Sequence, residues 1–219
     1  MKNILLVNDD GIEDNKIKIL EIALKKFGNV YVCAPESNRS CASQSIKFKE
    51  FSEQALRKID DNHFVHPHTP ADSVRYMLQF SNIKFDYCFS GINDGMNAGL
   101  YIQYSGTVGA AFEATMNNIP SCAISSIYNE KVDNDILYNI LSFVFNNNLL
   151  SNEYLLNINI SKNPEINKFS FVPQKLSFSE TNLRPTDVSE LLKGYITFTP
   201  LVIDRTGYSY LRKFNKLKL

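Results

Sequence analysis

Short apolar runs alternate with amphipathic segments along the first two thirds of the chain. Continuous runs at residues 4–7, 30–33, 85–89 and 121–125 are typical of strands buried on both faces of a parallel sheet. Between them, apolar residues recur at helical spacing at 17–27, from Thr69 onward, at 108–114 and at 133–145. This alternation predicts an α/β fold with right-handed crossovers.

The pattern changes after about residue 149. Leu156, Ile158 and Ile160 alternate with asparagines, and residues 169–172 and 195–201 look like exposed β segments. Alternation of this kind indicates one solvated face, so we expect antiparallel strands outside the main sheet. Residues 1–148 are then the α/β core, and 149–219 a C-terminal β arm that completes the same domain and serves oligomerisation. A further strand is expected at 46–51, with a weaker β excursion at 55–61.

Composition narrows the range of partners and compartments. The 219 residues carry 23 basic and 23 acidic side chains, so no net field favours a nucleic-acid polymer or an anionic membrane. The chain enters its first strand at once, without the apolar region of a signal peptide, and no apolar run reaches the roughly 20 residues of a membrane helix. The four cysteines lack CxxC spacing. We therefore expect reduced thiols in a cytoplasmic protein.

An acidic turn, Asn8-Asp9-Asp10-Gly11, follows the first strand. Two carboxylates about 4 Å apart repel by roughly 4 kcal/mol at an effective dielectric near 20, so both stay ionised only beside a cation. Hard oxygen ligands at the carboxyl end of a strand suit Mg²⁺ or Mn²⁺. A solvated turn without a metal is the other interpretation of this tripeptide, and the turn alone leaves it open.

Two other groups of residues carry candidate chemistry. Ser105, Gly106 and Thr107 precede a predicted helix, where free N–H groups form an anion site, although an ordinary helix cap has the same pattern. His63, His66 and His68 cluster before the Thr69 helix, and we interpret them as solvated or capping residues and not as a metal site.

Several stretches together resemble the SurE family of metal-dependent nucleotidases. They are Val7-Asn-Asp-Asp-Gly-Ile12, Ala34-Pro-Glu-Ser-Asn-Arg-Ser40, Thr69-Pro-Ala-Asp-Ser-Val74 and Ser90-Gly-Ile-Asn93 through Ser105-Gly-Thr-Val-Gly109. The resemblance implies a Rossmann-like three-layer α/β sandwich with a mostly parallel sheet and a C-terminal β-hairpin or arm. It also implies a 5′-nucleotidase that hydrolyses nucleoside monophosphates with a metal-activated water, with 3′-nucleotidase and exopolyphosphatase activity as further options. The expected assembly is a homodimer or homotetramer that exchanges the C-terminal arm.

The resemblance also assigns residues, position by position. Asp9, Asp10, Ser40 and Asn93 match the ligands of one divalent cation, Mg²⁺ or Mn²⁺. The groups around the phosphate match Asn38, Ser43, Asn97, Ser105, Gly106 and Thr107. Asp9 is the residue expected to orient or deprotonate the attacking water, since the matched motifs contain no histidine.

This sequence departs from the family pattern in four places. Lys16, Cys41 and His68 stand where the family usually has a small residue, and Cys41 lies beside a predicted ligand. The segment 160–195 is shorter than in typical members, which leaves the substrate-covering loop and the length of the exchanged arm open.

Two other classes of protein compete with this interpretation. A response-regulator receiver domain also opens with a strand that ends in two acids, but it needs an Asp after its third strand and a Lys after its fifth. The corresponding positions here lead into Ser90-Gly91 and into Ser126-Ile127. A non-catalytic nucleotide-binding protein of the same fold is the second alternative, and release of phosphate from a nucleotide would separate it from an enzyme.

Overall fold

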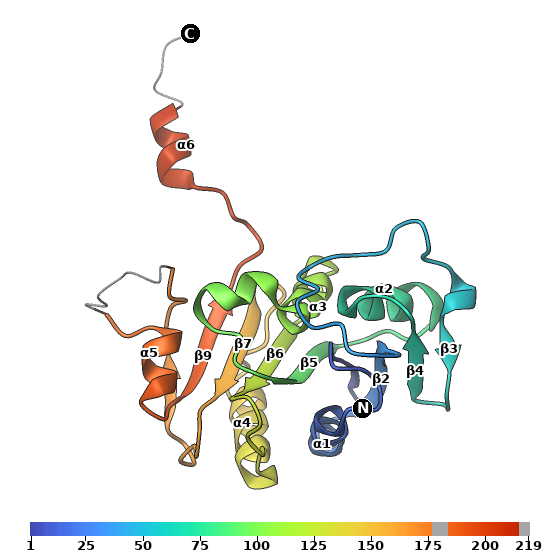
Figure 1. The fold of residues 1–219 in the computed structure, drawn as a ribbon, viewed down its shortest axis with the longest axis horizontal. Helices are drawn as coiled ribbons and strands as arrows, with labels where there is room; N and C mark the ends of the chain where they lie inside the picture. The colour runs from blue at the N-terminus through green and yellow to red at the C-terminus, as the bar shows by residue number, and fades with distance from the viewer. Residues whose placement is uncertain (177–183, 215–219) are drawn as a thin grey trace.

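A nine-stranded, mostly parallel sheet runs through the whole protein (Figure 1). The computed structural model describes residues 1–176 and 184–214. The strand order is β3-β4-β2-β1-β5-β6-β7-β9-β8, with antiparallel pairing only at β3·β4 and β7·β9 within the described chain. The strands are β1 Asn3–Val7, β2 Asn29–Pro35, β3 Arg57–Lys58, β4 His63–His66, β5 Tyr87–Asp94, β6 Ser121–Ser126, β7 Leu155–Ile160, β8 Phe169–Phe171 and β9 Ile196–Leu201.

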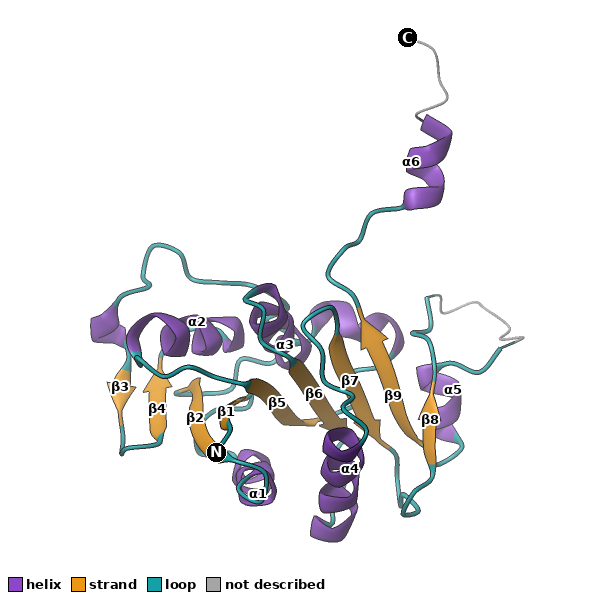
Figure 2. Cartoon of the chain, turned by 180° about the vertical axis from the view of Figure 1, so that it is seen from behind, coloured by secondary structure: helices purple, strands orange, loops and turns teal. Residues whose placement is uncertain are grey.

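Helices cover both faces of this sheet and make three layers (Figure 2). α1 and α4 pack on one face, and α2 and α3 pack on the other. The α-helices are α1 Asn15–Leu24, α2 Pro70–Phe80, α3 Gly106–Met116, α4 Asn134–Asn146, α5 Asp187–Leu192 and α6 Tyr208–Phe214, and the 3₁₀ turns are η1 Glu53–Ala55 and η2 Gly99–Tyr104. The three-layer α/β prediction is confirmed.

Strand β1 shows why the apolar runs are continuous. Leu6 belongs to the same buried cluster as Leu20 of α1 and Ile140 of α4, whereas its neighbour Leu5 belongs to the cluster of Met77 of α2 on the opposite side. Successive side chains of a strand point to opposite faces, so a strand covered on both sides needs apolar residues at every position.

The helix predicted to begin at Thr69 is confirmed. Thr69 is the N-cap of α2, Pro70 lies in the first turn, and Thr69 and Asp72 form a reciprocal capping box. This arrangement satisfies donors that the first turn of a helix leaves unpaired.

The strand predicted at residues 46–51 is wrong. This segment is irregular, and Ile46 and Phe48 are exposed. The edge of β4 is instead paired by the two residues of β3, at Arg57 and Lys58, within the predicted excursion at 55–61. An apolar run whose side chains gain no buried face has nothing to hold it in a sheet.

The placement of the strands after residue 149 outside the main sheet is also wrong. β7 pairs in parallel with β6 along its whole length, and all six of its residues are buried. The asparagines at 157 and 159 are polar positions inside the protein, not a solvated face. β9 then adds to β7 in antiparallel orientation, as expected for late β segments, but it does so within the same sheet.

The projecting part of the chain is shorter than the predicted arm. After Leu201 the backbone leaves the sheet, and α6 stands away from the body of the protein (Figure 1). Residues 177–183 of the shortened 160–195 segment lie outside the described residues. None of the helices in the described ranges combines the length and the hydropathy needed to cross a bilayer.

Candidate active site

The acidic turn leaves the carboxyl end of β1 in a fixed conformation. The Asn8 amide donates to the carbonyl of Gly11 at 2.9 Å, and the Gly11 N–H donates back to Asn8 Oδ1 at 3.1 Å. Gly11 has φ of +105°, and a Cβ there would lie 3.3 Å from the backbone of Ser37. Only glycine adopts this conformation at low cost, and it lets the Ser37 loop approach. The turn therefore presents Asp9 and Asp10 in one defined arrangement.

Asp9 is held from two directions. Its buried carboxylate accepts a hydrogen bond from Thr107 Oγ1 at 2.6 Å, and its backbone carbonyl accepts one from the Arg39 N–H at 2.6 Å. Burial raises the pKa of Asp9, and the hydrogen bond from Thr107 opposes that rise. A raised pKa favours a carboxyl group that must exchange a proton.

Asp10 follows Asp9, and one of its two carboxylate oxygens has no hydrogen-bond partner among the described residues. Oδ1 accepts from Asn38 Nδ2 at 2.9 Å, whereas Oδ2 is buried without a hydrogen-bond partner among the described residues. Burial, and then the charge of Asp9, raise the pKa of Asp10 to about 6. A buried, unpaired carboxylate oxygen is costly, and a divalent cation is the group that would satisfy it. The residues of this turn therefore fit the expected metal.

A pocket of about 190 Å³ gathers residues from four separate segments. Five of the residues singled out from the sequence line it, namely Asp9, Ser40, Asn93, Asn97 and Ser105. Their side chains offer carboxylate, hydroxyl and amide oxygens, which are ligands for hard cations and partners for phosphate. The carboxyl ends of parallel strands meet at one edge of a sheet, which explains why distant segments converge here.

The remaining predicted residues support the pocket or lie beside it. Asn38 holds Asp10, and its Oδ1 also accepts from the Ser40 N–H at 2.9 Å, so it sets the course of that loop. Gly106 lets α3 approach, because a Cβ there would lie 2.9 Å from Asp9 Oδ2. Ser43 donates its hydroxyl to the Gln103 carbonyl at 3.0 Å, and its part in phosphate binding stays a prediction.

Asn93 and Ser105 each use part of their side-chain hydrogen-bonding capacity within the protein. The Asn93 amide nitrogen donates to the Gly95 carbonyl at 2.6 Å, so its side-chain oxygen is the atom left for a ligand. Ser105 is the N-cap of α3 and accepts from the Val108 N–H at 3.0 Å. The capping interpretation of this motif is therefore confirmed, and the anion site at the same helix end stays a prediction.

Two buried asparagines of β7 position Asn97. Asn159 accepts from the Asn97 N–H at 2.8 Å, and both Asn157 and Asn159 donate to its carbonyl. The Asn97 side chain in turn donates to Ser125 Oγ at 2.9 Å. Each of these bonds is buried, so the loop after β5 is held at the pocket by β7 and β6.

Several residues of the pocket were not predicted from the sequence. Asp94, Met96, Tyr101 and Tyr104 line it, and none of them was singled out. Lys16, noted only as a departure from the family, pairs with Asp94 at 2.5 Å and donates to Ser126 Oγ at 2.9 Å. The Lys16 ammonium thus neutralises the Asp94 carboxylate. The adjacency of Asp94 to Asn93 in sequence is the signal that could have found it.

The prediction that the histidines are solvated or capping residues is wrong for His66 and His68, which are buried while Thr69 caps α2. His66 is fully buried and bonds Ser73 Oγ through Nε2 at 2.7 Å, and buried His68 bonds the Tyr76 hydroxyl at 2.9 Å. Partly buried His63 bonds Asp60 and Glu21. In the described chain no three His, Cys, Asp or Glu side chains cluster as a metal site, and the histidines fix α2 and the strand before it.

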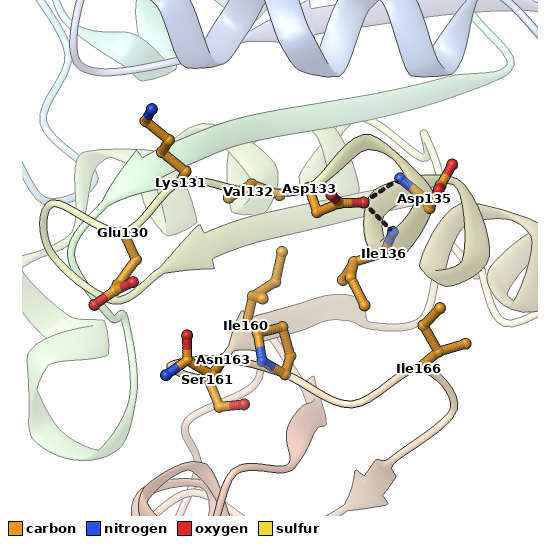
Figure 3. Close-up of a pocket in the computed structure, with 11 residues that line it drawn as sticks. Glu130, Lys131, Val132, Asp133, Asp135, Ile136, Ile160, Ser161, Asn163 and Ile166 are labelled. Carbon is orange, nitrogen blue, oxygen red and sulfur yellow. Dashed lines mark hydrogen bonds between the residues drawn. The ribbon is translucent and has the colours of Figure 1, made fainter.

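A larger hollow than this pocket lies away from this chemistry. It measures about 480 Å³ between the amino end of α4 and the loop after β7 (Figure 3). Glu130, Asp133 and Asp135 contribute three carboxylates to its lining. Asp133 already accepts from the N–H groups of Asp135 and Ile136, so the helix end is occupied by an acidic cap. The N–H groups that could bind a phosphate at this helix end are therefore already engaged.

Comparison with known proteins gives consistent results. A family model described as Survival protein SurE matches residues 4–180. A protein of Campylobacter hominis named 5′-nucleotidase SurE is 33% identical, covering 99% of this chain and 98% of its own. One from Clostridium botulinum with the same name is 34% identical over 99% of both chains. The crystal structure of the SurE protein from Aquifex aeolicus superimposes with a TM-score of 0.83 at 30% identity, covering 97% of this chain and 98% of that one.

Proposed function

This chain belongs to the SurE family, and from that premise we propose that it is a 5′-nucleotidase that depends on one divalent cation. The observation that carries the metal dependence is the buried Oδ2 of Asp10, unpaired within the described chain and next to Asp9. Asp9, Asp10, Ser40 and Asn93 would hold Mg²⁺ or Mn²⁺. When bound, such a cation offsets phosphate charge and acidifies water.

Asp9 is the residue best placed to orient or deprotonate the attacking water. Its carboxylate lines the pocket and is fixed by Thr107. Both properties favour this role, because a base must be held within reach of the proton that it takes. Asn97 and the first turn of α3 would receive the phosphate oxygens, where N–H donors and the helix dipole favour negative charge.

Ser40 is the rival nucleophile of the pocket. It lies on the same loop as Asn38, is exposed, and supplies a hydroxyl oxygen that suits a cation. A serine that attacks phosphorus needs an adjacent base, and the Ser40 hydroxyl has no hydrogen bond to a carboxylate or histidine among the described contacts. Direct attack by water is therefore the favoured route, without a covalent intermediate.

A phosphate-release screen tests this proposal. Nucleoside 5′- and 3′-monophosphates and polyphosphate would be offered with Mg²⁺, Mn²⁺ or EDTA. We expect release from 5′-monophosphates that EDTA abolishes, and a loss of at least about 100-fold in kcat for Asp9→Asn. Asp61→Asn, at an exposed position far from the turn, is the matched control. Full turnover in EDTA, or a phosphoserine trapped at Ser40, would contradict the mechanism, and nucleotide binding without release would favour the non-catalytic alternative.

An assembly built by the C-terminal segment is the second part of the proposal. α6 leaves the body of the protein with Tyr208, Tyr210 and Leu211 exposed, although such side chains usually find cover. An apolar hollow of about 380 Å³ at the base of this segment offers a place for a partner's chain. A chain that ends after Ile203 should lose the homodimer or homotetramer in light scattering. A mass unchanged by this truncation, or a monomeric full-length protein, would argue against the exchange.

The proposed compartment is the cytoplasm. All four cysteines are free thiols, which reducing compartments maintain.

A further inference from the structure

The metal pocket shares one wall with a second hollow. A recess of about 190 Å³ is lined by η2, by Lys175 and by Val188 of α5. Met96 and Tyr101 line both this recess and the metal pocket. The two hollows therefore adjoin, with these two side chains between them.

The chemistry of the recess differs from that of the pocket beside it. Its lining includes Met96, Ala98, Leu100, Tyr101 and Val188, which are apolar or aromatic, whereas the metal pocket presents carboxylate, hydroxyl and amide oxygens. Tyr101 is 54% exposed although it lies in the wall of a hollow. Exposed aromatic surface next to a polar site is typical of a ligand contact.

One buried carboxylate holds the recess in shape. Asp187 is fully buried, and it accepts from the Gly99 N–H at 2.7 Å and from the Lys175 N–H at 2.9 Å. The Gln174 amide donates to the Gly99 carbonyl at 2.7 Å. Gly99 has φ of +58°, and a Cβ there would lie 3.0 Å from Val188, so glycine also permits the close packing of η2 on α5. The recess is thus preformed by η2, by α5 and by residues 174 and 175.

We propose that the recess binds the nucleobase of the substrate, with one face of the base against Tyr101. This inference rests on the proposed function. A nucleoside monophosphate has an anionic end and a flat, largely apolar end, and the two adjoining hollows match these two ends. Aromatic side chains stack on nucleobases without distinguishing them, because every base has a π face.

The lining also predicts how selective the site is. Apart from the Lys175 ammonium and backbone groups, the residues of the recess carry few polar atoms that could read the edge of a base. Strong discrimination between bases requires buried hydrogen-bonding partners that the wrong base leaves unpaired. We therefore expect both purine and pyrimidine monophosphates to be accepted, with purines preferred for their larger stacking area.

The experiment compares a substrate that has a base with one that lacks it. kcat/KM would be measured with Mn²⁺ for AMP and for ribose 5-phosphate, in the wild type, Tyr101→Ala, Tyr101→Phe and Tyr128→Ala. Tyr128 is 68% exposed and lines neither hollow, so it is the matched surface control. Tyr101→Ala should lose about 5- to 150-fold on AMP, mainly through KM, and keep its activity on ribose 5-phosphate. Tyr101→Phe should retain both activities.

Three outcomes would overturn the proposal. They are an equal loss on both substrates, an unchanged kcat/KM for AMP in Tyr101→Ala, and a wild type that does not distinguish AMP from ribose 5-phosphate. A wild type that hydrolyses neither substrate would refute the proposed function and not the recess. Calorimetric titration of adenosine into EDTA-treated protein tests the recess alone: we expect binding to the wild type and to Tyr101→Phe and its loss in Tyr101→Ala.

Discussion

Thr107 on α3 donates a hydrogen bond of 2.6 Å to the carboxylate of Asp9, 98 residues earlier in the chain. The bond joins the amino end of a helix on one face of the sheet to the turn after β1. It stabilises the ionised form of a carboxylate whose pKa burial raises.

Replacing Thr107 with valine should therefore shift the pH dependence of activity. Valine keeps the shape of threonine but cannot donate, so the pKa of Asp9 should rise further. The acid limb of kcat/KM should move to higher pH, because Asp9 is then protonated over a wider range. Thr107→Ser keeps the hydrogen-bond donor, so the acid limb of its kcat/KM profile should lie at the same pH as in the wild type. A uniform loss of rate with no shift of the limb would indicate a purely structural role.

Removal of the metal should weaken the fold most at neutral pH. The pKa of Asp10 is about 6 in the fold against 3.8 ordinarily, so its protonation stabilises the metal-free protein at low pH and that contribution is lost as pH rises through about 6. Mn²⁺ needs the ionised form, so it should raise Tm more at pH 7.5 than at pH 5. At 100 times Kd the gain is about 2.7 kcal/mol, or roughly 5–10 °C.

The matched variant for this measurement is Asp10→Asn. Without the second charge, it should be more stable than the wild type in EDTA at pH 7.5, and it should gain less from Mn²⁺. If Mn²⁺ raises Tm by the same amount in the wild type and in Asp10→Asn, the cation binds elsewhere.

Acid should destabilise the protein through His66. Burial lowers the pKa of His66 to about 3, while the unfolded chain keeps the ordinary value of 6.5. The unfolded state therefore binds more protons between these values, and stability falls as pH drops below about 6.5, by at most about 1.4 kcal/mol per pH unit. The ring is fully buried and its Nδ1 already accepts from the His68 N–H, so a second proton has no acceptor there.

His66→Gln isolates this contribution, because glutamine does not titrate and still has a donor for Ser73. In urea unfolding, the wild type should lose its advantage over the variant as pH falls from 6 to 4. Asp9 and Asp10 contribute to the pH dependence of stability in the opposite sense, but equally in both proteins, so their contributions cancel in the difference. A difference that is independent of pH would exclude His66 as the cause.

Replacement of Asn159 should damage both stability and substrate binding. Leucine at this position would leave the buried N–H of Asn97 without its partner, at a cost of about 1–3 kcal/mol in the free energy of unfolding. The loop would lose its position, so KM should rise. Asn157→Leu removes only a donor to the Asn97 carbonyl, which Asn159 also serves, and should be milder. A larger loss of stability in denaturant unfolding and a larger rise in KM for Asn157→Leu than for Asn159→Leu would contradict this account.

The same asparagines explain where sequence patterns failed. Alternation of apolar and polar residues usually marks a solvated face, so the segment at Leu156–Ile160 predicted a strand outside the sheet. The polar positions instead bond the loop that carries Asn97, and that loop is 60 residues away in sequence. Periodicity records which positions differ in polarity, but it does not record what they face.

The candidate site, in contrast, could be predicted from the sequence because of where its residues lie relative to the strands. Asp9, Ser40, Asn93, Asn97 and Ser105 follow predicted strands or precede a predicted helix, and in a parallel sheet these positions meet at one edge. Tyr101 was missed because η2 has neither helical nor strand periodicity, so nothing local indicated where its side chain would lie. Its position depends on Asp187, which comes 88 residues after Gly99.

The distribution of the cysteines also makes the protein easy to label. Cys33, Cys88 and Cys122 are fully buried, and burial raises the pKa of each thiol, so they are unreactive while the fold persists. Cys41 is exposed in the wall of the metal pocket, next to Ser40. A maleimide fluorophore would therefore attach there without removal of any native cysteine. A dye at this position would lie in the wall of the pocket, so a change in its emission on addition of Mn²⁺ or AMP would test whether they bind there.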